Sequence, residues 1–145
     1  MIIDDTATAL TTILVGGTAL TAMLSTVPNT GTAIVPAIYH IQAPDAADLP
    51  YVVFNHQGGG PELINPSNLE SNVWWIRSYS MTSALNSALI FEQVDLLLHK
   101  KNITITDATT IQCVRDQNIS LVENLPTGEP IYTCGGMYRI RTTNT

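Results

Sequence analysis

The chain has 145 residues and a mass of 15.7 kDa, the length of one domain with a single buried core. Hydrophobic residues make up 45% and charged residues only 12%, which indicates a folded protein whose surface suits contacts with copies of itself or a partner. The net charge of −6 and the lack of clustered Lys and Arg argue against stable DNA binding.

The N-terminal segment from Thr6 to Pro44 contains no Asp, Glu, Lys or Arg, which raises the question of a membrane helix. Threonines, the pair Gly16-Gly17 and Pro28 interrupt it, and no Lys or Arg flanks it to set an orientation, so we expect no membrane span. Apolar residues at helical spacing instead predict two short helices, or one kinked helix, ending before Pro28.

Two extended segments follow. Residues 33–41 read as a short strand, and the consecutive apolar residues of Tyr51–His56 predict a strand covered on both faces. The next stretch, GGGPELINPSNLES, is rich in glycine, proline and asparagine, so we expect residues 57–71 to form a long mobile loop. Residues 73–81 are aromatic-rich and predict another strand.

The C-terminal half begins with a helix predicted from about residue 84 to His99, capped by Thr82 or Ser83. Apolar residues occupy most of its circumference, so we expect its own sheet and a neighbouring subunit to cover it. Glu92, Asp95 and His99 share one stripe, which we interpret as a solvated face. Strands at about 110–122 and 131–142 complete the chain, with residues 142–145 frayed.

This order of elements predicts a single α+β domain over residues 1–145, with a mainly antiparallel sheet and helices packed on one face.

No catalytic, cofactor or metal site emerges from the sequence. The run Gly58–Gly60 lacks the Lys and the following helix of a phosphate-binding loop, and it lacks the third glycine of a dinucleotide fingerprint. His40 and His56 end neighbouring strands, but no further ligand at suitable spacing joins them. The aromatic residues lack a basic groove for stacking bases, so we assign them to core and interface packing.

The two cysteines are predicted to remain free thiols. If the segment around Leu125–Pro130 is a hairpin loop, Cys134 falls near Ile119 and Cys113 lies opposite Ile140, too far apart for a disulfide bridge.

Several segments together resemble the tail terminator (tail completion, or tail-to-head joining) proteins of long-tailed bacteriophages. The similarity covers most of the chain through short hydrophobic motifs: LVGG, IYH, LPYVVFNH, SYSMTSALNSALIFEQVDLLL and YTCGGMYRIRT. The second helical stretch after Gly16-Gly17 departs from the family pattern.

The resemblance implies a structural role without catalysis or cofactor. Such proteins form a ring, commonly six-fold, which caps the head-proximal end of the tail tube, stops its polymerisation and joins it to the neck of the head. The implied partners are copies of the chain, the tail tube protein and a head-neck connector protein. The implied location is the tail-neck junction of the virion, after assembly in the host cytoplasm.

Two hypotheses about residues follow. The first 76 positions hold six acidic residues and no Lys or Arg, which would suit a lumen through which DNA passes without binding, with Asp45, Asp48, Glu62 and Glu70 facing it. We expect the contacts of the ring to involve the glycine run and the apolar strand and helix that follow it: Gly58, Gly59, Gly60, Glu62, Leu63, Trp74, Ile90, Val94 and Leu97.

Three alternatives remain open. The chain could be another head-tail joint protein, such as a connector stopper or head-completion protein. It could be a small enzyme or ligand-binding domain using His40 and His56 near the glycine run, or a membrane-associated protein using its uncharged N-terminus.

Overall fold

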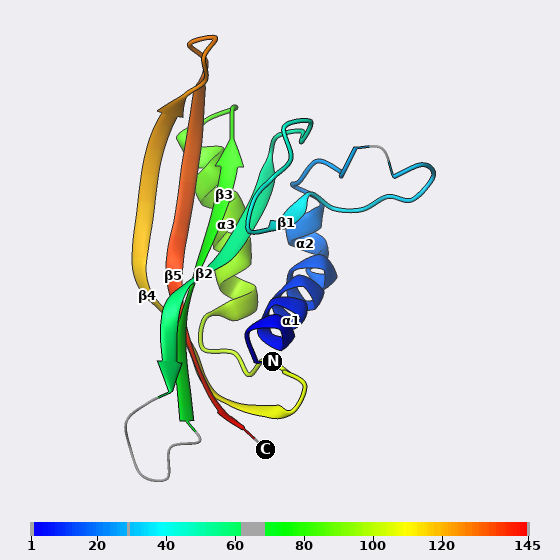
Figure 1. The fold of residues 1–145 in the computed structure, drawn as a ribbon. Helices are drawn as coiled ribbons and strands as arrows, with labels where there is room; N and C mark the ends of the chain where they lie inside the picture. The colour runs from blue at the N-terminus through cyan, green and yellow to red at the C-terminus, as the bar shows by residue number, and fades with distance from the viewer. Residues whose placement is uncertain (1, 29, 62–68, 145) are drawn as a thin grey trace.

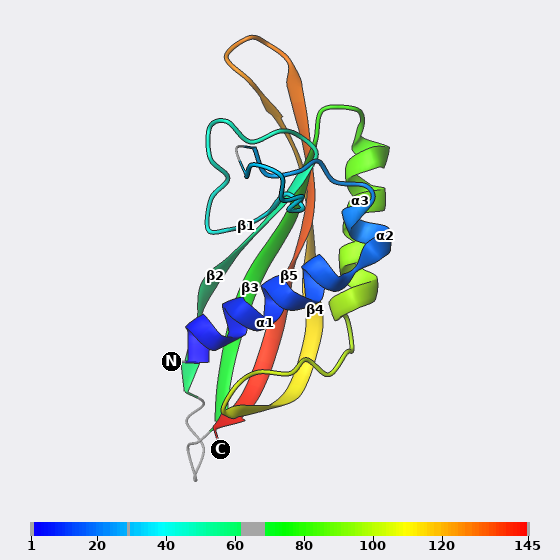
Figure 2. The same cartoon turned by 90° about the vertical axis from the view of Figure 1, so that its right-hand side faces the viewer.

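The computed structural model describes residues 2–28, 30–61 and 69–144. These residues form helices α1 (Ile2–Gly16), α2 (Thr18–Thr21) and α3 (Ala84–Leu98), and one five-stranded sheet in the order β1-β2-β3-β5-β4. The strands are β1 (Ile38–His40), β2 (Tyr51–Pro61), β3 (Leu69–Ser80), β4 (Ala108–Asn124) and β5 (Pro130–Asn144). Only β1 and β2 pair in parallel, and α1 and α3 lie on the same side of the sheet (Figure 1, Figure 2), so the predicted α+β class is confirmed.

The N-terminus forms two helices, as predicted, and the break falls at Gly17. A Cβ added to Gly17 would lie 2.5 Å from Leu97 Cδ1, so a larger residue here would require the Leu97 side chain to shift. Among the described residues, no helix is long and apolar enough to cross a membrane.

The glycine run is part of a strand, so the prediction of a loop is wrong for residues 57–61 and 69–71. Gly58, Gly59 and Gly60 pair with Val73, Asn72 and Ser71 of β3, after a bulge that follows His56. Backbone hydrogen bonding to β3 therefore outweighs the low strand propensity of glycine here. The predicted mobility of residues 62–68 concerns positions outside the described residues.

Helix α3 begins as predicted, because Ser83 accepts a hydrogen bond from the backbone N–H of Asn86 at 3.0 Å. The core lies between the helices and one face of the sheet. Its largest fully buried side chains come from α1, α2, α3 and the strands β2, β3 and β5: Leu10, Leu14, Leu20, Val52, Phe54, Trp74, Ile76, Ile90, Val94, Leu98, Tyr138 and Ile140.

The long hairpin β4–β5 extends beyond the end of β3, whose pairing with β5 stops at Ser80 and Tyr132, and its tip stands clear of the other strands (Figure 1). The predicted register holds in the middle, where Cys113 lies opposite Ile140. Two bulges in β4 shift it elsewhere, so Cys134 lies opposite Ser120 instead of Ile119. Strand β5 runs on to Asn144, which corrects the prediction that fraying begins at residue 142.

Candidate interaction surfaces

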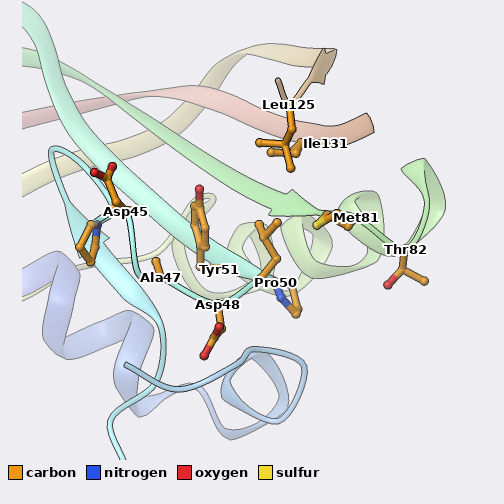
Figure 3. A pocket seen from close by; sticks show the side chains of 12 residues that line it. Asp45, Ala47, Asp48, Pro50, Tyr51, Met81, Thr82, Leu125 and Ile131 are labelled. Carbon is orange, nitrogen blue, oxygen red and sulfur yellow. The ribbon is translucent and has the colours of Figure 1, made fainter. Parts of the chain in front are cut away.

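A hollow of about 530 Å³ lies between the loop that precedes β2 and the β4–β5 hairpin. Figure 3 shows Leu125 and Ile131 on the hairpin side, Asp45 and Asp48 on the loop side, and Tyr51 between them. No His, Ser or Cys is among the residues that line it, and the groups there that could react are Thr82, Asp45 and Asp48. Among the described residues, no three His, Cys, Asp or Glu side chains are grouped as a metal site would require.

One face of the sheet carries no helix, and we call it the uncovered sheet face. Strand alternation places on it the residues that the register sets opposite one another between β2, β3 and β5. They include a row of aromatic side chains and three of the chain's four arginines: Tyr51, Trp75, Arg77, Tyr79, Met137, Arg139 and Arg141. These side chains are half-buried, and residues 41–43 of the loop before β2 line a hollow with Tyr51, Arg77 and Tyr79 at one end of the face.

Arg77 lies at the centre of the uncovered sheet face. Its guanidinium is 3.8 Å from the centroid of the Trp75 ring, and its Nη2 donates to Asn55 Oδ1 at 3.1 Å. Gly135 on the adjacent strand leaves the space, since a Cβ there would lie 3.1 Å from Arg77 Cγ. Stacking and hydrogen bonding therefore hold this cation in one place on an otherwise aromatic surface.

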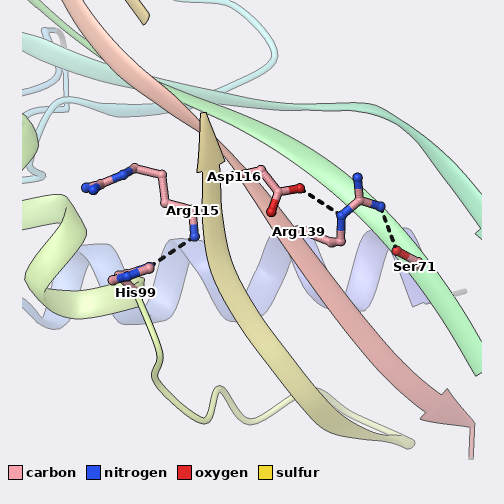
Figure 4. A network of polar contacts seen from close by, with 5 residues as sticks. All are labelled: Ser71, His99, Arg115, Asp116 and Arg139. Atoms are coloured by element: carbon pink, nitrogen blue, oxygen red, sulfur yellow. Dashed lines mark hydrogen bonds and ion pairs between the residues drawn. The ribbon is translucent and has the colours of Figure 1, made fainter. Parts of the chain in front are cut away.

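Arg139 links three strands on the same face. Its Nε donates to Asp116 Oδ2 at 2.7 Å and its Nη1 donates to Ser71 Oγ at 3.0 Å, joining β4, β5 and β3 (Figure 4). The pair with Asp116 is partly exposed, so it adds little stability but fixes the direction of both side chains.

The outer side of the helix layer is also apolar. On α3, Leu85, Leu89 and Leu96 are 69%, 43% and 61% exposed. Exposed leucines spaced along one helix indicate a surface that binds something, because scattered single residues would not align in this way.

The stripe predicted as solvated on α3 instead faces the sheet. Asp95 pairs with Arg115 at 2.5 Å and accepts a hydrogen bond from Tyr138 Oη at 2.7 Å, while His99 Nδ1 accepts from the backbone N–H of Arg115 at 3.0 Å (Figure 4). Burial and the hydrogen bond to Asp95 raise the pKa of Tyr138 far above its usual value. Only Glu92 of this stripe is exposed, so the prediction is wrong for Asp95 and His99.

The two histidines near the glycine run both flank Trp74. The His40 ring stacks on Phe54 with centroids 5.0 Å apart, and the His56 ring contacts Trp74 edge-on at 5.3 Å. His56 Nε2 also shares a hydrogen bond of 3.0 Å with Asn72 Oδ1. Aromatic packing and one amide partner account for both histidines as structural residues.

Several residues predicted at subunit contacts lie in the core. Trp74, Ile90 and Val94 are fully buried within the chain, so they cannot meet a neighbour, and this part of the prediction is wrong. Leu97 is partly buried against Gly17. Gly58, Gly59 and Gly60 lie on the β2–β3 hairpin, and Glu62 and Leu63 lie outside the described residues.

The residues that the sequence analysis missed are the ones next to these. Trp75 and Arg77 face outward, whereas Trp74 and Ile76 face inward. Because side chains alternate along a strand, the segment VWWIRSYS indicates that these two pairs lie on opposite faces. The alternation alone does not show which of the two faces packs against the helices, because each face carries a tryptophan.

Both cysteines are free thiols, as predicted. Burial raises the pKa of Cys113 to about 12, and burial also raises the pKa of Cys134. Neither thiol is therefore activated as a nucleophile.

No model of a protein family matches the chain, and no curated protein matches it. Among solved structures, a similar chain is described as "Virion of native gene transfer agent (GTA) particle", with a TM-score of 0.71 and 12% sequence identity. The alignment covers 94% of this chain and 93% of that chain. At this identity the similarity shows a shared fold, and it extends over almost the whole of both domains.

Proposed function

We propose that the chain is a structural subunit of a phage-like virion and that it terminates the tail. In this proposal a ring of copies, six in the resembling family, caps the head-proximal end of the tail tube, stops its growth and offers a surface to the neck. The observation that carries the proposal is the fold, which a chain of a virion particle shares from end to end.

Two further features of the described residues support a role in assembly. The uncovered sheet face and the exposed leucines of α3 lie on opposite sides of the domain, as head-to-tail contacts between copies require. The hollow beside the β4–β5 hairpin is lined without His, Ser or Cys, so it does not by itself support the alternative of a small enzyme.

The acidic residues suit the lumen of such a ring. Asp45 and Asp48 are exposed on the loop before β2, and Glu70 is half-buried on β3, while Glu62 lies outside the described residues. Carboxylates along the channel would repel the phosphates of passing DNA. The proposal therefore includes Asp45 and Asp48 facing the lumen, and an assembled ring with these residues on its outer wall would contradict this assignment.

The test uses tail tubes of the same phage, assembled in the absence of this protein. The expected result is a ring at one end of each tube in negative-stain electron micrographs, together with arrest of further tube growth when free tube protein is added. Tail-less heads serve as the comparison. Binding to the portal vertex alone would favour a connector stopper or head-completion protein, and binding to neither would refute a role in the joint.

A further inference from the structure

We propose that the two outer surfaces of the domain bind each other in successive copies, so that the helix layer of one copy packs on the uncovered sheet face of the next. The inference rests on the proposed self-assembly and names the surfaces that form its contact. The helix surface, which we call the outer helix surface, consists of exposed residues of α1 and α3: Thr8, Thr11, Thr12, Val15, Leu85, Leu89 and Leu96.

The outer helix surface is more apolar than its composition suggests. The hydroxyls of Thr8, Thr11 and Thr12 each donate to the backbone carbonyl four residues earlier, at 3.0 Å. These bonds satisfy the hydroxyl groups inside the helix, so the threonines can present their methyl groups outward without losing hydrogen bonds on contact. Val15 on α1 and the three leucines on α3 add exposed apolar groups, and the exposed Glu92 lies beside the leucines on the same side of α3.

The uncovered sheet face has the composition of a binding partner. Tryptophan, tyrosine and arginine are the residues that dominate the energy of protein interfaces, and Trp75, Tyr79 and Arg77 lie together at its centre. Trp75 and Asn55 already hold the Arg77 side chain in one conformation, so binding would cost little additional side-chain conformational entropy.

The charges on the two surfaces favour a second copy of the chain as the partner of the uncovered sheet face. Every charged residue of α1 and α3 is acidic, and Asp4 and Glu92 are exposed. The uncovered sheet face carries Arg77, Arg139 and Arg141 against Asp116 and Glu123, of which Asp116 is paired with Arg139. The exposed Asp45 and Asp48 lie at the end of this face next to Tyr51, so its positive charge is confined to the three arginines. These arginines attract the acidic helix layer of a second copy, whereas two helix layers repel each other.

The areas also match. Strands β2, β3, β4 and β5 have 11, 12, 17 and 15 residues. A face of four strands over the length of the shortest measures about 36 Å by 19 Å, or roughly 700 Å². A stable protein interface buries about 800 Å² on each partner. Because the two surfaces lie on opposite sides of a two-layer domain, each copy can bind two neighbours, and the chain of contacts closes when the rotation between copies divides a full turn.

The first variants disable one surface at a time. Leu85→Asp with Leu89→Asp places two carboxylates on the outer helix surface, where both positions are exposed and the fold tolerates polar side chains. Arg77→Glu reverses the central charge of the sheet face, and Met137→Glu is a second variant there in case Arg77→Glu fails to fold. Ile34→Asp, at a position 85% exposed on the segment between α2 and β1, is the matched control.

Analytical ultracentrifugation and electron microscopy with tail tubes measure the assembly. We expect each surface variant to weaken self-association at least about 30-fold, and the control to assemble like the wild type. Circular dichroism verifies that each variant is folded.

Mixing a helix-surface variant with a sheet-face variant gives the sharpest result. Each retains one intact surface, and these two surfaces are complementary, so an equimolar mixture should form a one-to-one heterodimer and nothing larger. A ring from the mixture, or normal rings from Leu85→Asp with Leu89→Asp, would overturn the inference while leaving the proposed function intact. A wild-type protein that never self-associates, alone or on tubes, would overturn both.

Discussion

The three glycines of β2 differ in what surrounds them, and substituting each by alanine separates their roles. Gly59 has φ +127°, and a Cβ there would lie 2.2 Å from Ser71 O and 2.7 Å from Asn72 Cα. At Gly58 and Gly60 no atom lies within 4 Å of an added Cβ. The structure therefore predicts one intolerant position between two tolerant ones.

The expected loss for Gly59→Ala combines two effects. An unfavourable backbone conformation costs about 1–3 kcal/mol, and the contact with the β3 backbone must be relieved by moving one strand away from the other. We expect a destabilisation of about 2–4 kcal/mol, reduced toward the lower value if the end of the hairpin shifts. Gly58→Ala and Gly60→Ala should leave the stability unchanged or raise it by up to about 1 kcal/mol, because alanine restricts the unfolded chain.

Urea unfolding followed by tryptophan fluorescence measures these differences, since Trp74 and Trp75 lie in the adjacent strand. The three midpoints are compared at equal slope, so that a change in midpoint reports stability alone. If Gly59→Ala unfolds within about 0.5 kcal/mol of Gly58→Ala, the close pairing of β2 and β3 at this position is wrong.

Three further predictions concern buried polar groups and the alkaline limit of the fold. Tyr138→Phe should lower the free energy of unfolding by about 1–2 kcal/mol, because the Asp95 carboxylate loses a hydrogen bond, and a melting temperature equal to the wild type would contradict this role. Ser78→Ala should cost about 1–2 kcal/mol in urea unfolding, since the fully buried hydroxyl bonds the Ser87 carbonyl at 2.8 Å, and an unchanged midpoint would count against it. Burial raises the pKa of Cys113 from 9.0 to about 12, so the unfolded chain loses this proton first; its stabilising effect is complete below pH 9 and is lost as the pH rises toward 12. Between pH 8 and 10 this amounts to about 1.4 kcal/mol, and Cys113→Val should show a correspondingly smaller loss in urea unfolding at the two pH values.

The positions of helices and strands could be predicted from local sequence patterns, because each pattern depends on residues that are neighbours in the chain. Thr82 or Ser83 before an apolar run predicted the start of α3, and the aromatic-rich segment around Trp75 predicted a strand. The class of fold followed from the order of these elements.

Features that depend on distant residues could not be predicted in this way. A helical wheel places Asp95 on a polar stripe, but it contains no information about Arg115 and Tyr138, which lie 20 and 43 residues further along. Likewise, the glycine run reads as a loop until β3 supplies hydrogen-bonding partners for it. Tertiary contacts override propensity at both places.

The candidate surfaces could likewise be predicted only in part from the sequence. The sequence indicated surplus apolar surface on α3, and the exposed leucines agree with this. It could not separate Ile90 and Val94, which face the core, from Leu85 and Leu89, which face outward, because apolar residues surround the helix almost completely.

The bulges of β4 have a consequence for a protein that assembles. β4 is an edge strand of 17 residues, long enough to recruit another strand and begin an unlimited fibre. The irregularities after Thr110 and after Arg115 interrupt the even spacing of free backbone groups along this edge. These bulges therefore make β4 a poor template for edge-to-edge pairing between copies of the chain.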